Sequence, residues 1–83
     1  MQYKYDRQAD AAYITLSAKP YAYGEELDSE RRIDYARDGS PVGIELLCVS
    51  GGVDLTDLPN RDEVAKLLAR RKIRVLAADS TLI

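Results

Sequence analysis

Apolar and polar residues alternate in two short runs near the start of the chain, over residues 2–5 and 11–17. Alternation with a period of two is typical of half-buried β-strands, and aromatic and β-branched residues favour them. Residues 6–10 separate the two runs and have the length of a loop. The pattern predicts a β-hairpin, in which Asp6 closes the first strand through an Asx-type turn and Asp10 caps the start of the second.

A third strand is expected over residues 21–28, although its pattern is less regular than that of the first two. Gly24 is the candidate for a bulge, because a glycine inside a strand often marks one. Acidic residues surround Leu27 on both sides. This strand therefore either has a polar face or lies at an edge of the sheet.

The clearest pattern covers residues 31–49, where two alternating runs flank Asp38 and Gly39. This dipeptide predicts a two-residue type I′ turn, which requires positive φ at both central residues. Pro41 then falls opposite Ala36, which favours a looser loop or an edge position. The pairs counted outward from the turn are Tyr35 with Val42 and Ile33 with Ile44 on an apolar face, and Asp34 with Gly43 and Arg32 with Glu45 on the other.

A helix is predicted over residues 59–72. Asn60 fits the N-cap position, and Glu63 three residues later fits the partner of a capping box. An apolar stripe suits this helix to covering one face of the sheet. The stripe consists of Val64, Leu67 and Leu68, and the sheet residues expected beneath it are Ile14, Leu16, Ile33, Ile44 and Leu46.

These elements predict an α+β fold: an antiparallel β-meander of about four or five strands, one C-terminal helix packed on one face, and a short strand after it. The last strand is expected over residues 73–78, added to an edge of the sheet or paired with another subunit. We expect a single domain over residues 1–83, with the meander core at 3–50 and the helix at 59–72.

The counts of cysteine and histidine exclude two common ways of stabilising a small domain. The 83 residues include one cysteine, Cys48, and no histidine, so they offer neither an internal disulfide nor a zinc-type ligand cluster. A domain of this size buries a smaller share of its surface than a large one does. Self-association is the remaining device, and we therefore expect a homo-oligomer, most simply a dimer.

Charge is distributed unevenly along the chain. Residues 1–58 carry a net charge of −5 and residues 59–83 a net charge of +3, within a total of −2. The acidic part argues against a general nucleic-acid surface, whereas the basic part allows a narrow one. The start of the chain lacks an apolar signal core, and no apolar run approaches the length of a membrane span. We expect a cytoplasmic protein with no membrane partner.

Two long stretches of the sequence resemble a known family. They are YDRQADAAYITLS, with an Ala-Asp-x-x-Tyr-Ile strand, and EELDSERRIDYARDGSPVGIELL, with an Ile-Asp-Tyr strand and an Asp-Gly turn leading into Val-Gly-Ile-Glu. Together they resemble the bacterial and archaeal domain-of-unknown-function family 2283 over residues 3–50. The resemblance implies a small β-rich or α+β fold, and an antitoxin-like or partner-binding role beside a small toxin-like neighbour. It implies no catalytic residues.

Two pairs of carboxylates are candidates for a metal or acid–base site. Asp6 and Asp10 fall short of the six or more oxygen ligands that Ca²⁺ takes, so a role in shaping the turn is the simpler interpretation. Asp34 and Glu45 share the polar face of the predicted hairpin, where a solvated charged surface is a simpler interpretation than a glycosidase-like pair. Cys48 has no histidine to serve as its base, and we interpret it as a buried structural residue.

Tyrosine supplies all six aromatic side chains, and three roles are open for them: core residues, interface contacts or a base-stacking platform. We predict an oligomer or partner interface that includes Tyr21 and Tyr23, which alternate on one strand face, together with Ile73 and Val75. The basic run is either a phosphate contact or a solvated helix end that complements the helix dipole. It consists of Arg70, Arg71, Lys72 and Arg74.

The sequence supports two functions of different class. The first is a non-enzymatic protein-interaction module, for which the family resemblance implies an antitoxin-like partnership with a neighbouring gene product. The second is a weak nucleic-acid-binding or regulatory protein that uses the basic run at 70–74. We expect no catalytic activity, no metal and no cofactor.

Overall fold

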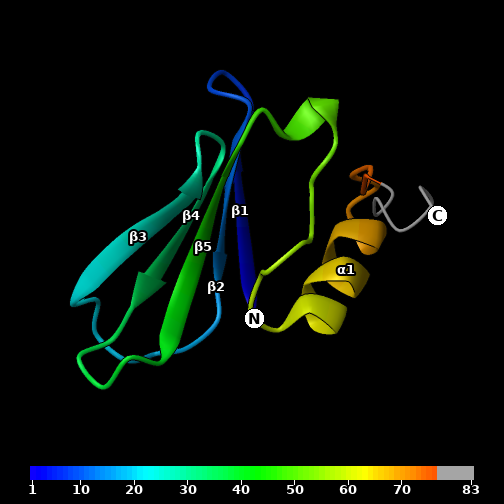
Figure 1. The fold of residues 1–83 in the computed structure, drawn as a ribbon. Coiled ribbons are helices and arrows are strands. Elements are labelled where there is room, and N and C mark those ends of the chain that lie inside the picture. Colours follow the sequence, from blue (N-terminus) through cyan, green and yellow to red (C-terminus); the bar gives the residue numbers. More distant parts are fainter. Residues whose placement is uncertain (77–83) are drawn as a thin grey trace, which may run out of the picture. The chain divides into compact units, whose positions relative to one another are not determined.

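The computed structural model describes residues 1–76 of the chain, and Figure 1 shows the order of its elements. Residues 1–48 form one compact unit, and a second unit begins at Val49. Each unit is described by itself below. Along the described chain, no helix is both long enough and apolar enough to cross a membrane.

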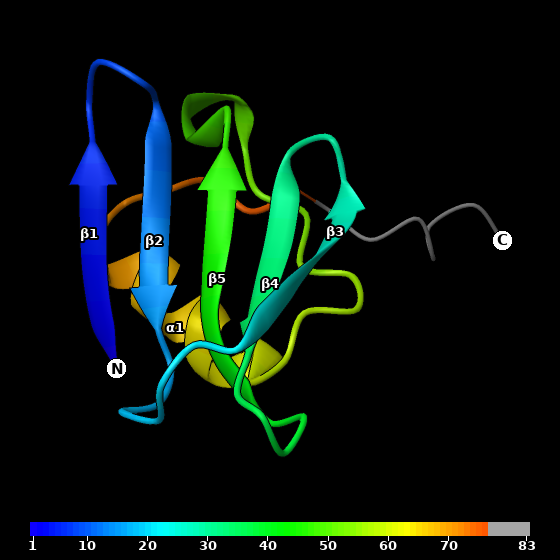
Figure 2. The same ribbon diagram turned by 90° about the vertical axis from the view of Figure 1, so that its left-hand side faces the viewer.

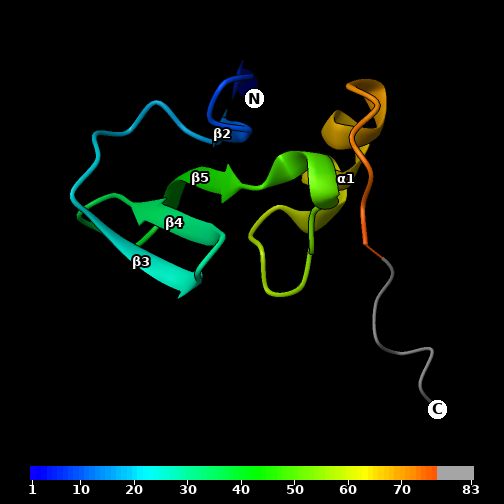
Figure 3. The same cartoon turned by 90° about the horizontal axis from the view of Figure 1, so that it is seen from above.

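The first unit is a five-stranded antiparallel sheet, which confirms the predicted class of sheet. Its strands are β1 (Gln2–Asp6), β2 (Ala11–Thr15), β3 (Tyr23–Asp28), β4 (Arg31–Tyr35) and β5 (Pro41–Leu47). Their order across the sheet is β1-β2-β5-β4-β3, so β5 lies in the centre (Figure 2). Strands β3, β4 and β5 form a meander of neighbours (Figure 3), and the β1–β2 hairpin joins that meander through the pairing of β2 with β5.

A row of isoleucines crosses the middle of the sheet and forms its buried face. Ile44 of β5 lies opposite Ile14 of β2 on one side and opposite Ile33 of β4 on the other. All three side chains are buried, together with Ala12 and Leu46. This row has the alternation expected of a sheet with one apolar face, and it confirms the predicted pairing of Ile33 with Ile44.

The β4–β5 turn differs from the predicted type I′ turn by one residue. Ala36 N donates to Ser40 O at 2.8 Å, and Gly39 N donates to Ala36 O at 2.9 Å. Gly39 has a φ of +86°, and the chain therefore forms the longer loop in which a type I turn precedes a left-handed residue. The extra residue shifts the register, so Tyr35 pairs with Pro41. The predicted pairing of Tyr35 with Val42 is wrong, whereas those of Asp34 with Gly43 and Arg32 with Glu45 are confirmed.

Asp6 shapes the first hairpin turn as predicted. Asp6 Oδ1 accepts hydrogen bonds from the backbone N–H groups of Gln8 at 3.0 Å and Ala9 at 3.2 Å, which is the Asx-type arrangement. Asp10 occupies the left-handed region with a φ of 53°, and its Oδ1 accepts a 2.9 Å hydrogen bond from the Tyr5 hydroxyl. The two carboxylates are therefore part of the turn.

Strand β3 lies at one edge of the sheet and is irregular, as its polar sequence predicts. Its register shifts between Glu26 and Asp28. The predicted bulge at Gly24 is therefore wrong, and Gly24 pairs regularly with Asp34. A bulge flanked by acidic side chains protects this edge from pairing with another strand.

The second unit contains a short 3₁₀ turn, η1 (Val49–Gly51), and the helix α1 (Arg61–Arg70). The helix is shorter than the predicted 59–72. Asn60 occupies the N-cap position with a φ of 53° and makes no side-chain cap hydrogen bond. The predicted capping box with Glu63 is therefore wrong, because the left-handed backbone of Asn60 turns its side chain away from the geometry that a box needs. The apolar stripe of the helix is buried: Val64, Leu67 and Leu68.

The helix ends in a Schellman arrangement built around a lysine. Lys72 has a φ of 60°, its backbone N–H donates to Ala69 O at 3.0 Å, and that of Ile73 donates to Leu68 O at 2.9 Å. These bonds satisfy carbonyl groups that the last turn leaves open. They also turn the chain sharply after residue 71, which is why the helix stops before the end of the basic run.

The predicted strand over residues 73–78 is not formed as a strand in the described chain. Val75 makes a single parallel bridge with Val53, fixed by hydrogen bonds from Val53 N to Arg74 O at 2.9 Å and from Leu76 N to Val53 O at 2.8 Å. Residues 77 and 78 lie outside the described residues. Packing of the helix on the sheet, and the organisation of the whole chain as one domain, stay predictions.

Candidate functional site

One face of the sheet carries a row of charged and hydroxyl-bearing side chains that crosses all five strands. We call this surface the polar face. The row follows from the register: Lys4 lies opposite Tyr13, Tyr13 opposite Glu45, Glu45 opposite Arg32, and Arg32 opposite Glu26. Asp34 belongs to the same face, one pleat further along β4, and these six residues define the surface. Opposite charges therefore face each other across β3, β4 and β5, which favours this register.

A second row of this face is nearly bare, because two of its members are glycines. Asp34 of β4 lies between Gly43 of β5 and Gly24 of β3. Neither glycine has a positive φ, so the chain does not need glycine there for its backbone conformation. The glycines instead leave room above the sheet, and the side chains of the neighbouring row fill that room.

Tyr13 fills the space above Gly43. A Cβ atom placed on Gly43 would overlap the hydroxyl oxygen and Cζ of Tyr13 and would lie only 2.9 Å from its Cε2. The ring therefore crosses β5, and its hydroxyl donates a 2.7 Å hydrogen bond to Asp34 Oδ2 on β4. Burial, followed by this hydrogen bond, raises the pKa of Tyr13 to about 12. The neutral hydroxyl is thus the form that the folded sheet favours.

Arg32 fills the space above Gly24. A Cβ atom on Gly24 would lie 2.7 Å from Arg32 Nε. Arg32 Nε donates to Asp34 Oδ1 at 3.2 Å, and its Nη2 donates to the Tyr21 hydroxyl at 3.2 Å. The hydrogen bonds to Asp34 and then to Tyr21 raise the pKa of Arg32. Four side chains therefore form one chain of contacts: Tyr13, Asp34, Arg32 and Tyr21.

Asp34 lies at the centre of this network. Both carboxylate oxygens of Asp34 are occupied, one by a phenol and one by a guanidinium group. In the part of the chain that the structure describes, no three carboxylate or cysteine side chains gather into a possible metal site. The arrangement is suited to holding a flat polar surface in one conformation.

The raised pKa of Tyr13 predicts a loss of stability in alkali. The folded pKa is about 12 and the ordinary value is 10.0, so the neutral hydroxyl stabilises the fold fully below pH 10 and ceases to do so as the pH rises towards 12. Tyr13→Phe should lower the free energy of unfolding by about 1 kcal/mol at pH 8, after allowance for solvent screening. Urea unfolding at pH steps from 8 to 12 should show this difference vanish at the alkaline end.

The control for this experiment is Tyr23→Phe. The Tyr23 hydroxyl makes no hydrogen bond to the residues that the structure describes, and its ring stacks on Tyr35 with 5.2 Å between the centroids. Loss of the Tyr23 hydroxyl should change the free energy of unfolding by less than about 0.5 kcal/mol at pH 8. A difference in the free energy of unfolding between wild type and Tyr13→Phe that stayed constant up to pH 12 would show that the pKa of the Tyr13 hydroxyl does not change on folding.

The two tyrosines of the predicted interface do not share one strand face. Strand β3 begins at Tyr23, so Tyr21 precedes it and reaches Arg32 on the polar face. Tyr23 alternates with Gly24 and points to the other face, where it stacks on Tyr35. Both side chains are largely exposed, Tyr21 at 56% and Tyr23 at 44%. Tyr21 thus belongs to the candidate site. The predicted alternation of Tyr21 and Tyr23 on one strand face is wrong because the strand starts at Tyr23, and the role of both residues in an interface stays a prediction.

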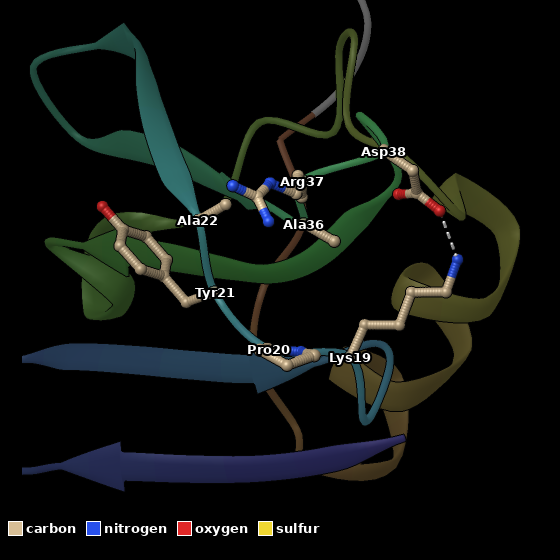
Figure 4. A pocket seen from close by; sticks show the side chains of 7 residues that line it. All are labelled: Lys19, Pro20, Tyr21, Ala22, Ala36, Arg37 and Asp38. Atoms are coloured by element: carbon tan, nitrogen blue, oxygen red, sulfur yellow. Dashed lines mark hydrogen bonds and ion pairs between the residues drawn. The ribbon is translucent and has the colours of Figure 1, made fainter.

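Beside Tyr21 the first unit is hollowed. The hollow has a volume of about 470 Å³ and lies between the segment before β3 and the tip of the β4–β5 hairpin (Figure 4). Its lining combines small apolar side chains with two cations and one carboxylate. The residues are Lys19, Pro20, Tyr21, Ala22, Ala36, Arg37 and Asp38.

The basic run is spread around the end of the helix. Arg70 is the last helical residue, Arg71 is the C-cap and Lys72 is the left-handed residue that follows. Arg74 Nη2 donates a 3.0 Å hydrogen bond to Gly51 O, which ties it to the loop. The cations complement the negative end of the helix dipole, and their contact with phosphate stays a prediction.

The remaining candidates from the sequence lie apart from the polar network. Ile73 and Val75 are half-buried in the second unit, and their role in an oligomer interface stays a prediction. Cys48 is exposed and has a φ of 56°, so its interpretation as a buried residue is wrong. A hydrogen bond with Glu30, followed by the charge of that carboxylate, raises the pKa of the Cys48 thiol, which favours the unreactive thiol over the thiolate.

The family described as "Protein of unknown function (DUF2283)" matches residues 2–50. That is more than half of the chain, and it includes every strand of the sheet. The chain belongs to this family. Comparison with the curated proteins gives no match, and comparison with the solved structures gives none either.

The network joins residues from three of the motifs that carry the resemblance to DUF2283. Tyr13 comes from the Ala-Asp-x-x-Tyr-Ile strand, Asp34 from Ile-Asp-Tyr, and Gly43 from Val-Gly-Ile-Glu. In this DUF2283 domain the three motifs meet at one place, where the tyrosine crosses the glycine to reach the aspartate. The predicted pairing of Asp34 with Gly43 was the signal for this site, because a glycine opposite an aspartate leaves room for a side chain from the next strand.

Proposed function

We propose that this DUF2283 domain is a non-enzymatic protein-interaction module whose contact surface is the polar face. The observation that carries the proposal is the hydrogen-bonded network of Tyr13, Asp34, Arg32 and Tyr21. Each of these side chains is held by its neighbours at 2.7 to 3.2 Å. A surface whose polar groups are already ordered loses little conformational entropy when a partner covers it.

The composition of the polar face supports the same proposal. Tyrosine and arginine are enriched among the residues that dominate binding energy at protein interfaces. Here Tyr13, Tyr21 and Arg32 come together on one surface. The exposed rim carries charges of both signs, with Glu26 and Glu45 beside Lys4 and Arg32. Such a rim sets the orientation and specificity of a partner more than its affinity.

The partner in this proposal is a protein encoded beside this chain, bound in an antitoxin-like pairing. This choice rests on the family resemblance. It is tested first by affinity purification from the native cell with mass spectrometry, together with the identity of the adjacent open reading frame. Once the partner is purified, its dissociation constant provides the measurement for variants of the polar face.

Glu26→Lys should raise the dissociation constant for the purified partner at least fivefold, because it replaces an acid with a cation beside Arg32 on the polar face. Glu25→Lys is the matched control. Glu25 is the preceding residue of the same strand, is equally exposed, and alternates to the other face opposite Ile33. Glu25→Lys should leave the dissociation constant within twofold of the wild-type value. Isothermal titration calorimetry of both variants gives the comparison.

Circular dichroism melts of the two variants show whether each remains folded. Equal weakening by Glu25→Lys and Glu26→Lys would contradict a face-specific contact and would point to a general charge effect. Unchanged binding by Glu26→Lys would remove the polar face as the contact surface.

A further inference from the structure

We propose that the hollow beside Tyr21 receives an acidic side chain of the protein partner, with Arg37 as the group that binds its carboxylate. This proposal rests on the protein-interaction function and goes beyond it by naming the chemistry of the partner. The partner's contacting segment carries a glutamate or aspartate next to small apolar residues.

The charges that line the hollow leave one cation uncompensated. Lys19 Nζ lies 2.7 Å from Asp38 Oδ2, and Asp38 Oδ1 accepts hydrogen bonds from Ser40 N at 2.9 Å and Ser40 Oγ at 2.7 Å. The ion pair with Lys19, followed by the bonds from Ser40, lowers the pKa of Asp38. Lys19 and Asp38 therefore neutralise each other over the physiological pH range.

Arg37 differs from Arg32 of the polar face and from Lys19 of the hollow. Among the residues that the structure describes, its guanidinium group makes no hydrogen bond and no ion pair, whereas Arg32 and Lys19 are both engaged. Arg37 is exposed at the tip of the β4–β5 hairpin and lines the hollow (Figure 4). A guanidinium group binds a carboxylate through two parallel hydrogen bonds, which is the strongest polar contact available to it.

The apolar part of the lining suits the stem of an acidic side chain. Ala36 is buried, and Pro20 and Ala22 present small apolar surfaces around it. None of these three residues offers a polar side chain that would compete for the carboxylate. A hollow with a partly apolar lining and a few convergent polar groups orients a ligand through those groups, and Arg37 is the charged group here that has no counter-ion among the described residues.

The position of the hollow favours a protein segment over a free small molecule. The Tyr21 side chain lines the hollow, and its hydroxyl accepts a hydrogen bond from Arg32 of the polar face. The hollow and the polar face are therefore continuous through one residue. A partner that covers the polar face can extend a side chain past Tyr21 to Arg37 without a second binding event.

The test uses short capped peptides and the amide spectrum of the whole chain. The probe is acetyl-Ala-Leu-Glu-Ala-amide, and the matched peptide has glutamine in place of glutamate. In ¹⁵N–¹H titrations the glutamate peptide should shift the amides of Ala22, Ala36 and Arg37, and it should bind about tenfold more tightly than the glutamine peptide. Propionate alone supplies the free carboxylate and should bind more weakly than the glutamate peptide.

Arg37→Gln should remove the preference for glutamate. Arg7→Gln is the control, because Arg7 is also an exposed arginine at a hairpin tip and lies outside the hollow. It should keep the tenfold preference. Thermal melts establish that both variants are folded, which is expected because each change lies at an exposed loop position.

Three results would overturn the proposal: equal binding of the two peptides, an unchanged preference in Arg37→Gln, or binding of propionate as tight as that of the glutamate peptide. Binding measurements with the purified partner distinguish failure of this proposal from failure of the proposed function. If Glu26→Lys weakens that partner and Arg37→Gln does not, the interaction module stands and the hollow is not part of its contact.

Discussion

Gly43→Ala should lower the free energy of unfolding by about 3 kcal/mol. The new Cβ would overlap the hydroxyl and Cζ of Tyr13. Because the ring is rigid and crosses β5, it must leave the surface, and the 2.7 Å hydrogen bond to Asp34 breaks. Asp34 then keeps Arg32 alone as a side-chain partner on that face. Equilibrium unfolding in urea measures the loss.

Two other glycines provide graded controls for this substitution. Gly24→Ala places its Cβ 2.8 Å from Arg32 Cζ, but the flexible arginine can move aside, so the loss should be about 1 kcal/mol. A Cβ on Gly51 would have no atom within 4 Å, and Gly51→Ala should change stability by less than about 0.5 kcal/mol. If all three substitutions had the same effect, the role assigned to Gly43 would be refuted.

Ile44→Ala should lower the free energy of unfolding by about 4 kcal/mol. Ile44 is fully buried, at 0% exposure, and lies on the central strand between Ile14 and Ile33. Truncation removes three methyl or methylene groups and leaves a cavity that rigid strands on both sides cannot fill. Small domains have about 5–15 kcal/mol of total stability, so the variant should melt at a much lower temperature. Calorimetry and urea unfolding measure the loss.

Strand β5 supplies its own control for the effect of burial. Leu47 is 39% exposed, and Leu47→Ala should cost about 1 kcal/mol or less. Ile44→Val, which removes one methyl group, should cost about 1 kcal/mol. A loss for Leu47→Ala as large as that for Ile44→Ala would mean that burial in this sheet does not determine stability.

The antiparallel sheet was predictable because its strands obey local rules. Alternation placed the isoleucines on one face, and the Asp-Gly dipeptide located the hairpin. The turn type was not predictable from that dipeptide, because Asp-Gly fits both the two-residue turn and the longer loop with Gly39 left-handed. The predicted position of Pro41 opposite Ala36 already favoured the longer loop, in which Pro41 pairs with Tyr35 instead.

The polar network was only partly predictable. The sequence placed Asp34 opposite Gly43 and Arg32 opposite Glu45, but it gave no strand order, and the contact of Tyr13 with Asp34 depends on β5 lying between β2 and β4. The hollow was not predictable, since it joins the irregular segment before β3 to a hairpin tip. The capping box and the predicted end of the helix were wrong for a local reason: Asn60 and Lys72 both adopt left-handed backbone, which is most common for glycine.

The Tyr13–Asp34 hydrogen bond has a consequence for the kinetics of the sheet. It joins the β1–β2 hairpin to the meander across the pairing of β2 with β5, the contact between segments that are farthest apart in the sequence of this sheet. Such non-local pairing closes a long loop, and we expect it to form after both hairpins. Contacts made after the rate-limiting barrier slow unfolding without speeding folding. We therefore expect the tyrosine that crosses Gly43 to act mainly on the unfolding rate of the sheet, and the local hairpins to act on its folding rate.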